Sequence, residues 1–429
     1  MRTFKLTSLS AAILAASALV PTTSQAAGFV DDSSATLGIR NYYFNENGLN
    51  GNTFDRKEWV QGLQFSFSSG YLWDMIGFDY GAGAAMKLDN PANATGYSIT
   101  NLPADGSSTA DANDIAGTNI ANLKAKFGGD DMNANLRFGL QRSCTELYCP
   151  SGSRILEATS YGTYLEGNIE SLKLYGARWT QIHSRNNSFF AEGFQDAMGD
   201  EIDHLYIFGA AYKFDNGLGL YAEWGNSDDY LEKQFLKFDY TFNLGSGITL
   251  LIDGRWADAE EDGNGYATQG YESTYWNLSG TITVNDFYVK LGYNKTSDGD
   301  WDGEWHANFQ QDGAYNSTLD QWQGYNREDE RAWIVDIGYD FANIGYPGLV
   351  ANTYYAYGTD IDDASLAAGA NATTSDDNAH EWGHYITYTV QSGPMKDLSV
   401  EWQHFRVDNP VLGDEDTNRI KIRYDIALF

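Results

Sequence analysis

The chain has 429 residues and a formal net charge of −32, with 15% aromatic residues, 45 glycines, 7 prolines and 2 cysteines. Such an acidic balance repels phosphate backbones, so we expect no nucleic acid partner. Beyond the N-terminal segment no run reaches the roughly 18 apolar residues of a transmembrane helix. These features leave a β-rich exported protein as the class to test.

Residues 1–26 have the pattern of a secretory signal peptide. Two basic residues precede a mostly apolar stretch at 6–20, and small residues surround Ala26. We expect cleavage after Ala26, export, and a mature unit of residues 27–429. An N-terminal helix of the folded protein is the alternative, but polar residues follow immediately at 31–34.

Apolar and polar residues alternate with a period of two along the mature chain. In residues 59–68, Leu63 and Phe65 share one parity while Gln64 and Ser66 share the other. The same alternation recurs in residues 76–84, 123–127, 236–242, 276–284, 335–341 and 382–390. This period indicates β-strands. A soluble β-sandwich or propeller has the same local pattern and is the alternative.

Three observations favour a membrane barrel. The longer runs approach the roughly 9–11 residues that a tilted membrane strand needs. Aromatic residues recur near the ends of the runs, as in interface girdles. Short connections alternate with long polar ones, the latter at residues 89–119, 181–203, 257–273, 296–330 and 359–380. The sequence therefore predicts an all-β, transmembrane antiparallel β-barrel of about 18 strands, in contact with lipid and lipopolysaccharide of a bacterial outer membrane.

The last residue is an aromatic one, as expected of chains inserted by the barrel assembly machinery, which we count as a partner. Its parity is offset, because Ile422, Tyr424 and Ile426 share one face and Phe429 falls on the other. A local bulge is the explanation that we expect.

Several segments resemble the OprD family of outer membrane porins. They include residues 28–33, the run from Arg40 to Phe44, residues 57–71, the run from Asp340 to Leu349, and residues 391–399. The resemblance covers essentially the whole mature chain. It implies an 18-stranded barrel, sometimes a homotrimer, whose third loop folds inward and whose lumen carries a row of arginines opposite acidic residues.

The resemblance also implies function. Members of the family pass small carboxylates and amino acids, and a chitoporin subgroup passes chitin oligosaccharides. We therefore expect a passive channel for small hydrophilic solutes, without a cofactor and without enzymatic activity. A barrel enzyme and an adhesion barrel with a plugged lumen are the competing classes.

Strand parity selects candidate channel-lining residues. A charged side chain that faces hydrocarbon has a high free-energy cost. Charged residues that are opposite in parity to apolar neighbours should therefore face the lumen. The candidates are Arg40, Arg137, Arg255, Asp79, Asp239, Asp336, Tyr354, Glu401 and Gln403. Facing water, each arginine can bind solute carboxylates or hydroxyls, or it can be the fixed partner of a lumenal carboxylate.

Residues 141–160 are the candidate constriction. They follow the strand of Arg137, and the segment around Arg154 resembles the family's third loop. Cys144 and Cys149 are the only cysteines, and an oxidising compartment with this short spacing favours a disulfide between them. Such a bridge would stiffen a loop that lies inside the channel.

Departures from the family bear on the substrate. Tyr354 stands where many members have arginine, and Glu401 and Gln403 stand where members have lumenal arginines near the C-terminus. The basic row is therefore expected to be shortened, which favours neutral or amino sugars and chitin oligosaccharides. A carboxylate- or amino-acid-selective channel is the alternative.

An acidic loop gives a calcium alternative. Asp298, Asp300 and Asp302 resemble the first half of a calcium-binding loop, but the position that requires glutamate is Phe309. A solvated acidic loop is the ordinary interpretation, and otherwise we expect no metal. The tryptophans of the same loop, at 301, 305 and 322, either pack the loop or form a platform for sugar.

Overall fold

The computed structural model describes residues 27–50, 55–89, 114–186, 188, 190–308, 314–362, 365 and 377–429. The predicted signal peptide, residues 1–26, lies outside the described residues, as does most of the predicted loop 89–119. Helical segments include α2 (Ala27–Asp31) and the 3-10 turn η1 (Ala342–Ile344). Among the described residues, no helix has the length and apolarity needed to cross a membrane.

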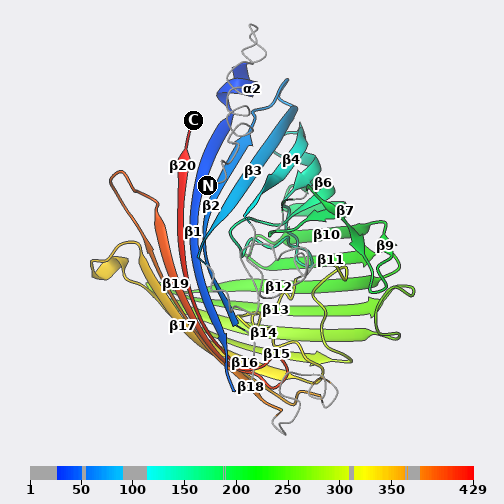
Figure 1. Ribbon diagram of the computed structural model, residues 1–429, viewed down its shortest axis with the longest axis vertical. Helices are drawn as coiled ribbons and strands as arrows, with labels where there is room; N and C mark the ends of the chain where they lie inside the picture. The colour runs from blue at the N-terminus through cyan, green and yellow to red at the C-terminus, as the bar shows by residue number, and fades with distance from the viewer. Residues whose placement is uncertain are drawn as a thin grey trace.

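Eighteen long antiparallel strands form a closed barrel, as the sequence predicted (Figure 1). The first nine are β1 (Ser34–Gly48), β2 (Asp55–Ser68), β3 (Ile76–Asp89), β4 (Ile115–Gly128), β5 (Met132–Gln141), β6 (Thr159–Ile169), β7 (Leu172–His183), β10 (Leu205–Lys213) and β11 (Gly219–Ser227). The other nine are β12 (Leu231–Gly245), β13 (Ile248–Glu261), β14 (Glu272–Val284), β15 (Phe287–Ser297), β16 (Arg331–Asp340), β17 (Leu349–Thr359), β18 (Ala379–Thr389), β19 (Ser399–Asp408) and β20 (Glu415–Ala427). Two short strands, β8 (Glu192–Gln195) and β9 (Glu201–Ile202), lie in the β7–β10 connection.

Pairing of the first and last strands closes the ring. β1 pairs with β2 on one side and with β20 on the other, where Arg40 lies opposite Arg423. β1 and β20 run side by side in Figure 1. Closure leaves no unpaired strand edge, which a sheet in lipid cannot tolerate.

Short and long connections lie at opposite ends of the barrel. Tight turns such as 170–171, 246–247 and 285–286 join strands at one end, and longer connections such as 142–158 and 298–330 join them at the other. Because the strands alternate in direction, these turns share one end, and the three-residue β11–β12 connection, 228–230, is a short one at the other end. This is the arrangement of outer membrane barrels, with short periplasmic turns and long external loops.

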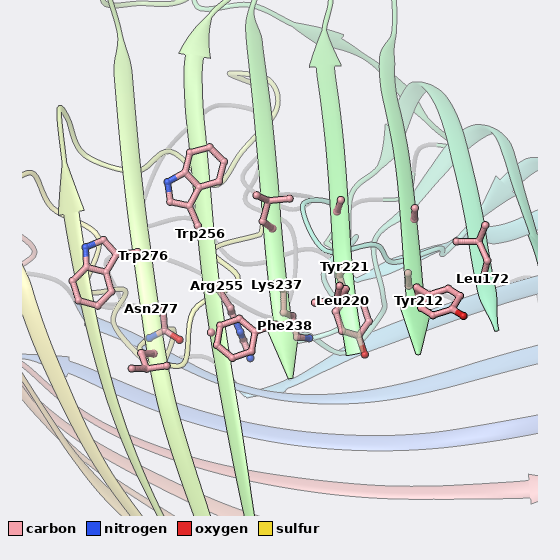
Figure 2. A pocket seen from close by; sticks show the side chains of 16 residues that line it. Leu172, Tyr212, Leu220, Tyr221, Lys237, Phe238, Arg255, Trp256, Trp276 and Asn277 are labelled. Carbon is pink, nitrogen blue, oxygen red and sulfur yellow. The ribbon is translucent and has the colours of Figure 1, made fainter. Parts of the chain in front are cut away.

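Apolar side chains cover the outer face. Leu123, Leu291 and Trp333 are 60%, 57% and 56% exposed. Figure 2 shows a hollow in this face on β10 to β14, where Phe238 and Trp276 lie on the outside. Neighbouring residues of opposite parity carry polar groups toward the lumen, so the alternation separates a lipid face from an inner face.

The β5–β6 loop, residues 142–158, folds into the barrel. Ile155 and Leu156 are buried against the inner wall at Gly62 of β2 and Gly83 of β3. A Cβ atom at Gly62 would come within 2.6 Å of Ile155, and one at Gly83 within 2.5 Å of Leu156. Glycine is needed at both positions because the loop approaches the wall so closely. The predicted inward constriction loop is confirmed.

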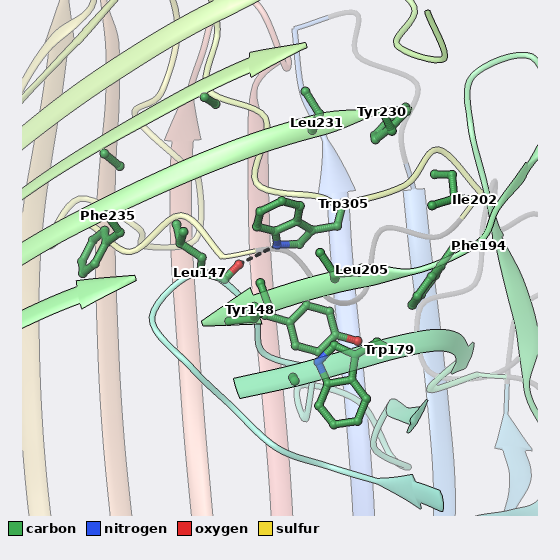
Figure 3. Close-up of a cluster of buried hydrophobic side chains, with 14 of the residues drawn as sticks. Leu147, Tyr148, Trp179, Phe194, Ile202, Leu205, Tyr230, Leu231, Phe235 and Trp305 are labelled. Carbon is green, nitrogen blue, oxygen red and sulfur yellow. Dashed lines mark hydrogen bonds between the residues drawn. The ribbon is translucent and has the colours of Figure 1, made fainter. Parts of the chain in front are cut away.

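A second loop, the β15–β16 loop of residues 298–330, also folds inward. Trp301 and Trp305 are almost fully buried in a cluster that includes Leu147 of the β5–β6 loop. The Trp305 indole Nε1 donates a hydrogen bond of 2.8 Å to the Leu147 carbonyl (Figure 3). The packing interpretation of these two tryptophans is confirmed, and the two loops hold each other inside the lumen.

The C-terminus contains the bulge that the parity offset required. The Leu428 amide donates to the Ala35 carbonyl at 2.8 Å, and the Ala35 amide donates to the Phe429 carbonyl at 3.2 Å. Leu428 and Phe429 therefore both lie opposite Ala35. This β-bulge reverses the direction in which the Phe429 side chain points. Phe429 lies on the outer face, with its ring 6.4 Å from the ring of Phe67.

Candidate substrate channel

Inward-facing residues of β1 to β5 line a pocket of about 280 Å³. Arg137 comes from the middle of β5, where it lies opposite Lys124 of β4 and Tyr164 of β6. Arg142 is the first residue of the β5–β6 loop and reaches the same pocket. Hydroxyl, amide and carboxylate groups complete the lining, from Thr36, Ser66, Ser68, Asp79, Asn122 and Gln141.

The charges of this pocket are not fully paired. Asp79 is bound by Lys124, whose Nζ lies 2.8 Å from its Oδ1, and by the Ser68 hydroxyl at 2.8 Å. Arg137 has no carboxylate partner among the residues that the structure describes. Its guanidinium donors are therefore available to a solute in the pocket.

The β5–β6 loop orients Arg142. Its Nε donates a hydrogen bond of 2.8 Å to the Pro150 carbonyl. The structure places a disulfide between Cys144 and Cys149, with an S–S distance of 1.94 Å, directly before Pro150. Within the described ranges Arg142 also forms no ion pair. The closed loop thus fixes the guanidinium through Nε, and through a longer contact of 3.8 Å from Nη2 to the Cys149 sulfur, without giving it a carboxylate partner.

A row of basic side chains runs along β20. Arg419, Lys421 and Arg423 occupy alternate positions and face inward, opposite Phe44, Tyr42 and Arg40 of β1. The shortening of the basic row stays a prediction, but it left out these three residues of β20. β20 supplies the charges that positions 354, 401 and 403 lack, and the alternation of basic and apolar residues in 419–424 was the signal that could have found them.

Acidic residues pair with this row. Arg40 Nη1 lies 2.7 Å from Asp425 Oδ1. Glu401 of β19 lies 3.8 Å from Lys421 Nζ and 3.6 Å from Arg423 Nη1. About a third of the Arg423 side chain remains exposed to the lumen. The two longer pairs with Glu401 are weak enough for an anionic group to exchange with this carboxylate.

Asp239, Arg255 and Asp336 lie on the inner face of β12, β13 and β16. Arg255 is held, because Nε lies 2.7 Å from Asp253 Oδ1 and Nη1 donates to Asn316 Oδ1 at 2.6 Å. The carboxylate of Asp336 accepts from Tyr288 at 3.2 Å. Arg255 and Asp336 have fixed protein partners, which distinguishes Arg255 from Arg137.

Tyr354 and Gln403 were predicted to line the channel, but neither reaches its surface. Tyr354 is 1% exposed, and its hydroxyl donates to Glu381 beneath the β15–β16 loop. The Trp322 amide of that loop donates to the same carboxylate at 3.1 Å. Gln403 is 7% exposed and donates to Glu401 at 2.6 Å. Strand parity was correct for both, but the β15–β16 loop covers Tyr354, and Gln403 is buried beside Glu401.

Arg154 lies inside the barrel on the β5–β6 loop. Its Nη1 donates to the Ser153 hydroxyl at 2.9 Å, and its guanidinium carbon lies 5.9 Å from the centre of the Phe44 ring. Arg154 therefore braces the loop beside β1, close to the β20 row.

The calcium alternative at residues 298–302 stays a prediction, and two of its three carboxylates have protein partners. Asp300 pairs with Arg327 at 2.7 Å and accepts the Glu328 amide at 2.7 Å. Asp302 accepts the Tyr266 hydroxyl at 3.0 Å. In the described part of the chain these carboxylates do not group with Asp298 around a common point. They connect the β15–β16 loop to its neighbours.

Comparisons with known proteins agree with this architecture. The profile of the outer membrane porin, OprD family, matches residues 27–428. Porin D of Pseudomonas aeruginosa is 26% identical over 436 residues, which cover 96% of this chain and 94% of that protein. Chitoporin of Escherichia coli is 24% identical over 423 residues, covering 90% and 87% of the two chains.

A solved structure shows the same fold. The crystal structure of OccK9 (OpdG) from Pseudomonas aeruginosa superposes with a TM-score of 0.81 at 23% identity, covering 94% of this chain and 100% of that one. With a closed barrel, an inward third loop and a family match over nearly its whole length, the chain belongs to the OprD family of outer membrane porins.

Proposed function

We propose that this porin passes small solutes that carry a carboxylate group. The observation that carries the proposal is the pocket with two guanidinium groups, Arg137 and Arg142, that lack carboxylate partners among the described residues. Guanidinium and carboxylate groups form paired, charge-assisted hydrogen bonds. A carboxylate solute is the ligand that completes this site.

The basic row of β20 provides a second place for the same group. Arg419 of this row is buried in an ion pair with Glu46. Lys421 and Arg423 share Glu401 at 3.8 and 3.6 Å, and Arg423 is partly open to the lumen. Conduction requires sites that bind well enough to attract a solute and weakly enough to release it. Lumenal arginines that share protein carboxylates meet both conditions.

Neutral sugars and chitin oligosaccharides are the second candidate. Amide and hydroxyl groups in the pocket, at Asn122, Ser66 and Ser68, favour them, and one relative is named chitoporin. The argument from a shortened basic row carries less weight, because β20 has three basic residues on its inner face. The carboxylate proposal therefore ranks first.

The test compares variants that each remove positive charge. Arg137→Gln, Arg142→Gln and the double variant are reconstituted in liposomes, and swelling rates are measured with benzoate and with N-acetylglucosamine oligomers. Lys126→Gln is the control, because Lys126 pairs with Asp74 at the turn end, away from the pocket. A hydrogen bond between a guanidinium and the benzoate carboxylate contributes about 1.5–3 kcal/mol. The double variant loses these bonds, so its benzoate permeation rate should fall by about tenfold.

The control and the neutral solutes should retain wild-type rates. Equal benzoate rates in wild type and double variant would overturn the carboxylate proposal. Faster permeation of the sugar oligomers than of benzoate in the wild-type protein would support the second candidate instead.

We also propose the cellular setting. Residues 1–26 direct export and are removed after Ala26, and the barrel assembly machinery then inserts the chain through a C-terminal strand that ends in Phe429. The mature barrel lies in the bacterial outer membrane against lipid and lipopolysaccharide, as a channel and not an enzyme. Association into a homotrimer belongs to the same proposal.

A further inference from the structure

A mixed group of metal-type ligands lies at the loop end of β10 and β11. Asp203 and His204 end the β7–β10 connection directly before β10, and Asp228 follows β11. The Asp228 amide donates a hydrogen bond of 3.1 Å to the His204 carbonyl, which adds one rung to the β10–β11 ladder. The backbone thus fixes His204 and Asp228 as cross-strand neighbours. Figure 1 shows β9 just beyond the ends of these two strands.

The group faces outward from the barrel. On the preceding rung Leu205 pairs with Ser227, and both are fully buried on the inner face. His204 and Asp228 have the opposite parity. The His204 ring packs 4.3 Å from the ring of Tyr206, which in turn lies 6.0 Å from Phe208. Such an aromatic row is typical of the membrane interface, so the group lies at the outer rim above it.

The potential metal-binding atoms of the three residues lie close together. One atom from each of Asp203, His204 and Asp228 lies within 4.8 Å of the other two. In the described part of the chain, none of the three forms an ion pair or a side-chain hydrogen bond. An imidazole and two carboxylates that meet without protein partners have unused ligand capacity directed at one point.

The donor set selects the kind of metal. Imidazole nitrogen with carboxylate oxygen suits zinc and similar divalent transition metals, whereas calcium and magnesium prefer oxygen ligands alone. Three protein ligands leave a fourth position open. The net charge of −32 favours accumulation of cations at the surface.

We propose that Asp203, His204 and Asp228 bind a zinc-type divalent metal ion at the outer rim, with one coordination position open. The ion joins the end of the β7–β10 connection to the β11–β12 turn. The site is independent of the solute pocket, so it can fail or succeed without affecting the proposed transport function.

The test uses the full-length porin in detergent micelles. Isothermal titration with Zn²⁺ measures affinity, and absorption in the visible range after loading with Co²⁺ reports nitrogen and oxygen ligation. His204→Asn and Asp228→Asn remove one ligand each. His380→Asn is the matched control, because His380 lies near a single carboxylate, Asp408, at 3.7 Å. Heat-modifiable mobility in electrophoresis verifies that each variant is folded.

Removal of a residue that only hydrogen-bonds to a metal ligand weakens metal binding by about 10- to 100-fold, and removal of the ligand itself should cost at least as much. Both ligand variants should therefore bind Zn²⁺ at least about tenfold more weakly and lose the Co²⁺ spectrum, while His380→Asn retains both. Wild-type affinity in folded His204→Asn and Asp228→Asn would overturn the proposal. Displacement of Zn²⁺ by an equal concentration of Ca²⁺ would also overturn it, because it would indicate an ordinary acidic site.

Discussion

Glu330 directly precedes β16, and its carboxyl group is enclosed by the β15–β16 loop. It is 1% exposed and accepts a hydrogen bond of 3.0 Å from the Arg327 amide. Burial raises the pKa of Glu330 from 4.5 to about 8, and the nearby Arg327 opposes this only in part. The packed loop therefore holds a proton that a solvated carboxyl would release.

This proton makes the packing of the loop depend on pH. Between pH 4.5 and about 8 the packed state binds more protons than the released state, so its stability falls as pH rises. The packed state of the loop is most stable below pH 4.5 and loses stability as pH rises from 4.5 to about 8. Above that range its stability no longer changes with the protonation of Glu330.

Hydrogen exchange of residues 314–330 tests this dependence. After correction for intrinsic rates, protection should fall by at least about tenfold from pH 5 to pH 9 in the wild-type protein. Glu330→Gln should remove the dependence, and Asp329→Asn, at an exposed neighbouring carboxylate, should retain it. Equal protection at both pH values in the wild type would contradict the account.

The sequence predicted which residues face inward, but not which protein groups pair with them. Parity put Arg137 and Arg255 on the inner face, and both lie there. Only the folded loops distinguish them, because Asn316 from the β15–β16 loop helps to hold Arg255. Loop contacts join residues distant in sequence, so strand periodicity carries no information on which arginine stays free.

At the scale of elements, one carboxylate attaches the β5–β6 loop to the inner wall at β11. Glu223 of β11 accepts the Thr145 hydroxyl at 2.7 Å and the amides of Glu146 and Leu147 at 2.9 and 2.8 Å. Hydrogen bonds to a charged group contribute about 1.5–3 kcal/mol each. Glu223 therefore holds the loop against the inner wall at β11.

Glu223→Ala should release this loop from the wall and widen the channel. We expect a higher single-channel conductance, by about twofold or more if the lost hydrogen bonds of several kcal/mol are not replaced, with more frequent current fluctuations. Glu166→Ala is the control, because Glu166 also faces the lumen but pairs with Lys173 at 2.9 Å and does not contact the loop. An unchanged conductance in Glu223→Ala would show that the loop does not depend on this anchor.

Elements differed in how far the sequence could predict them. Strands were predictable because a period of two is a local property, and the inward β5–β6 loop followed from the resemblance to the family. The inward course of the β15–β16 loop was not predicted, because it depends on distant contacts such as that between Trp305 and Leu147. The basic face of β20 was visible in the sequence and was overlooked.

At the scale of the whole molecule, the barrel separates three environments. Apolar side chains face outward, long loops lie at one end, and the basic row of Arg419, Lys421 and Arg423 lies on the inner wall. The overall charge of −32 therefore does not describe the lumen. Solutes meet a wall where guanidinium and carboxylate groups lie side by side, which is the basis of the proposed selectivity.

Single-channel recording in a planar lipid bilayer tests the central claim most directly. The account predicts discrete conductance steps from the purified wild-type protein, blocked by benzoate in a concentration-dependent manner and unaffected by chitohexaose at equal concentration. Absence of steps would contradict the channel itself. Steps blocked by chitohexaose and insensitive to benzoate would contradict recognition of carboxylates by the lumenal arginines.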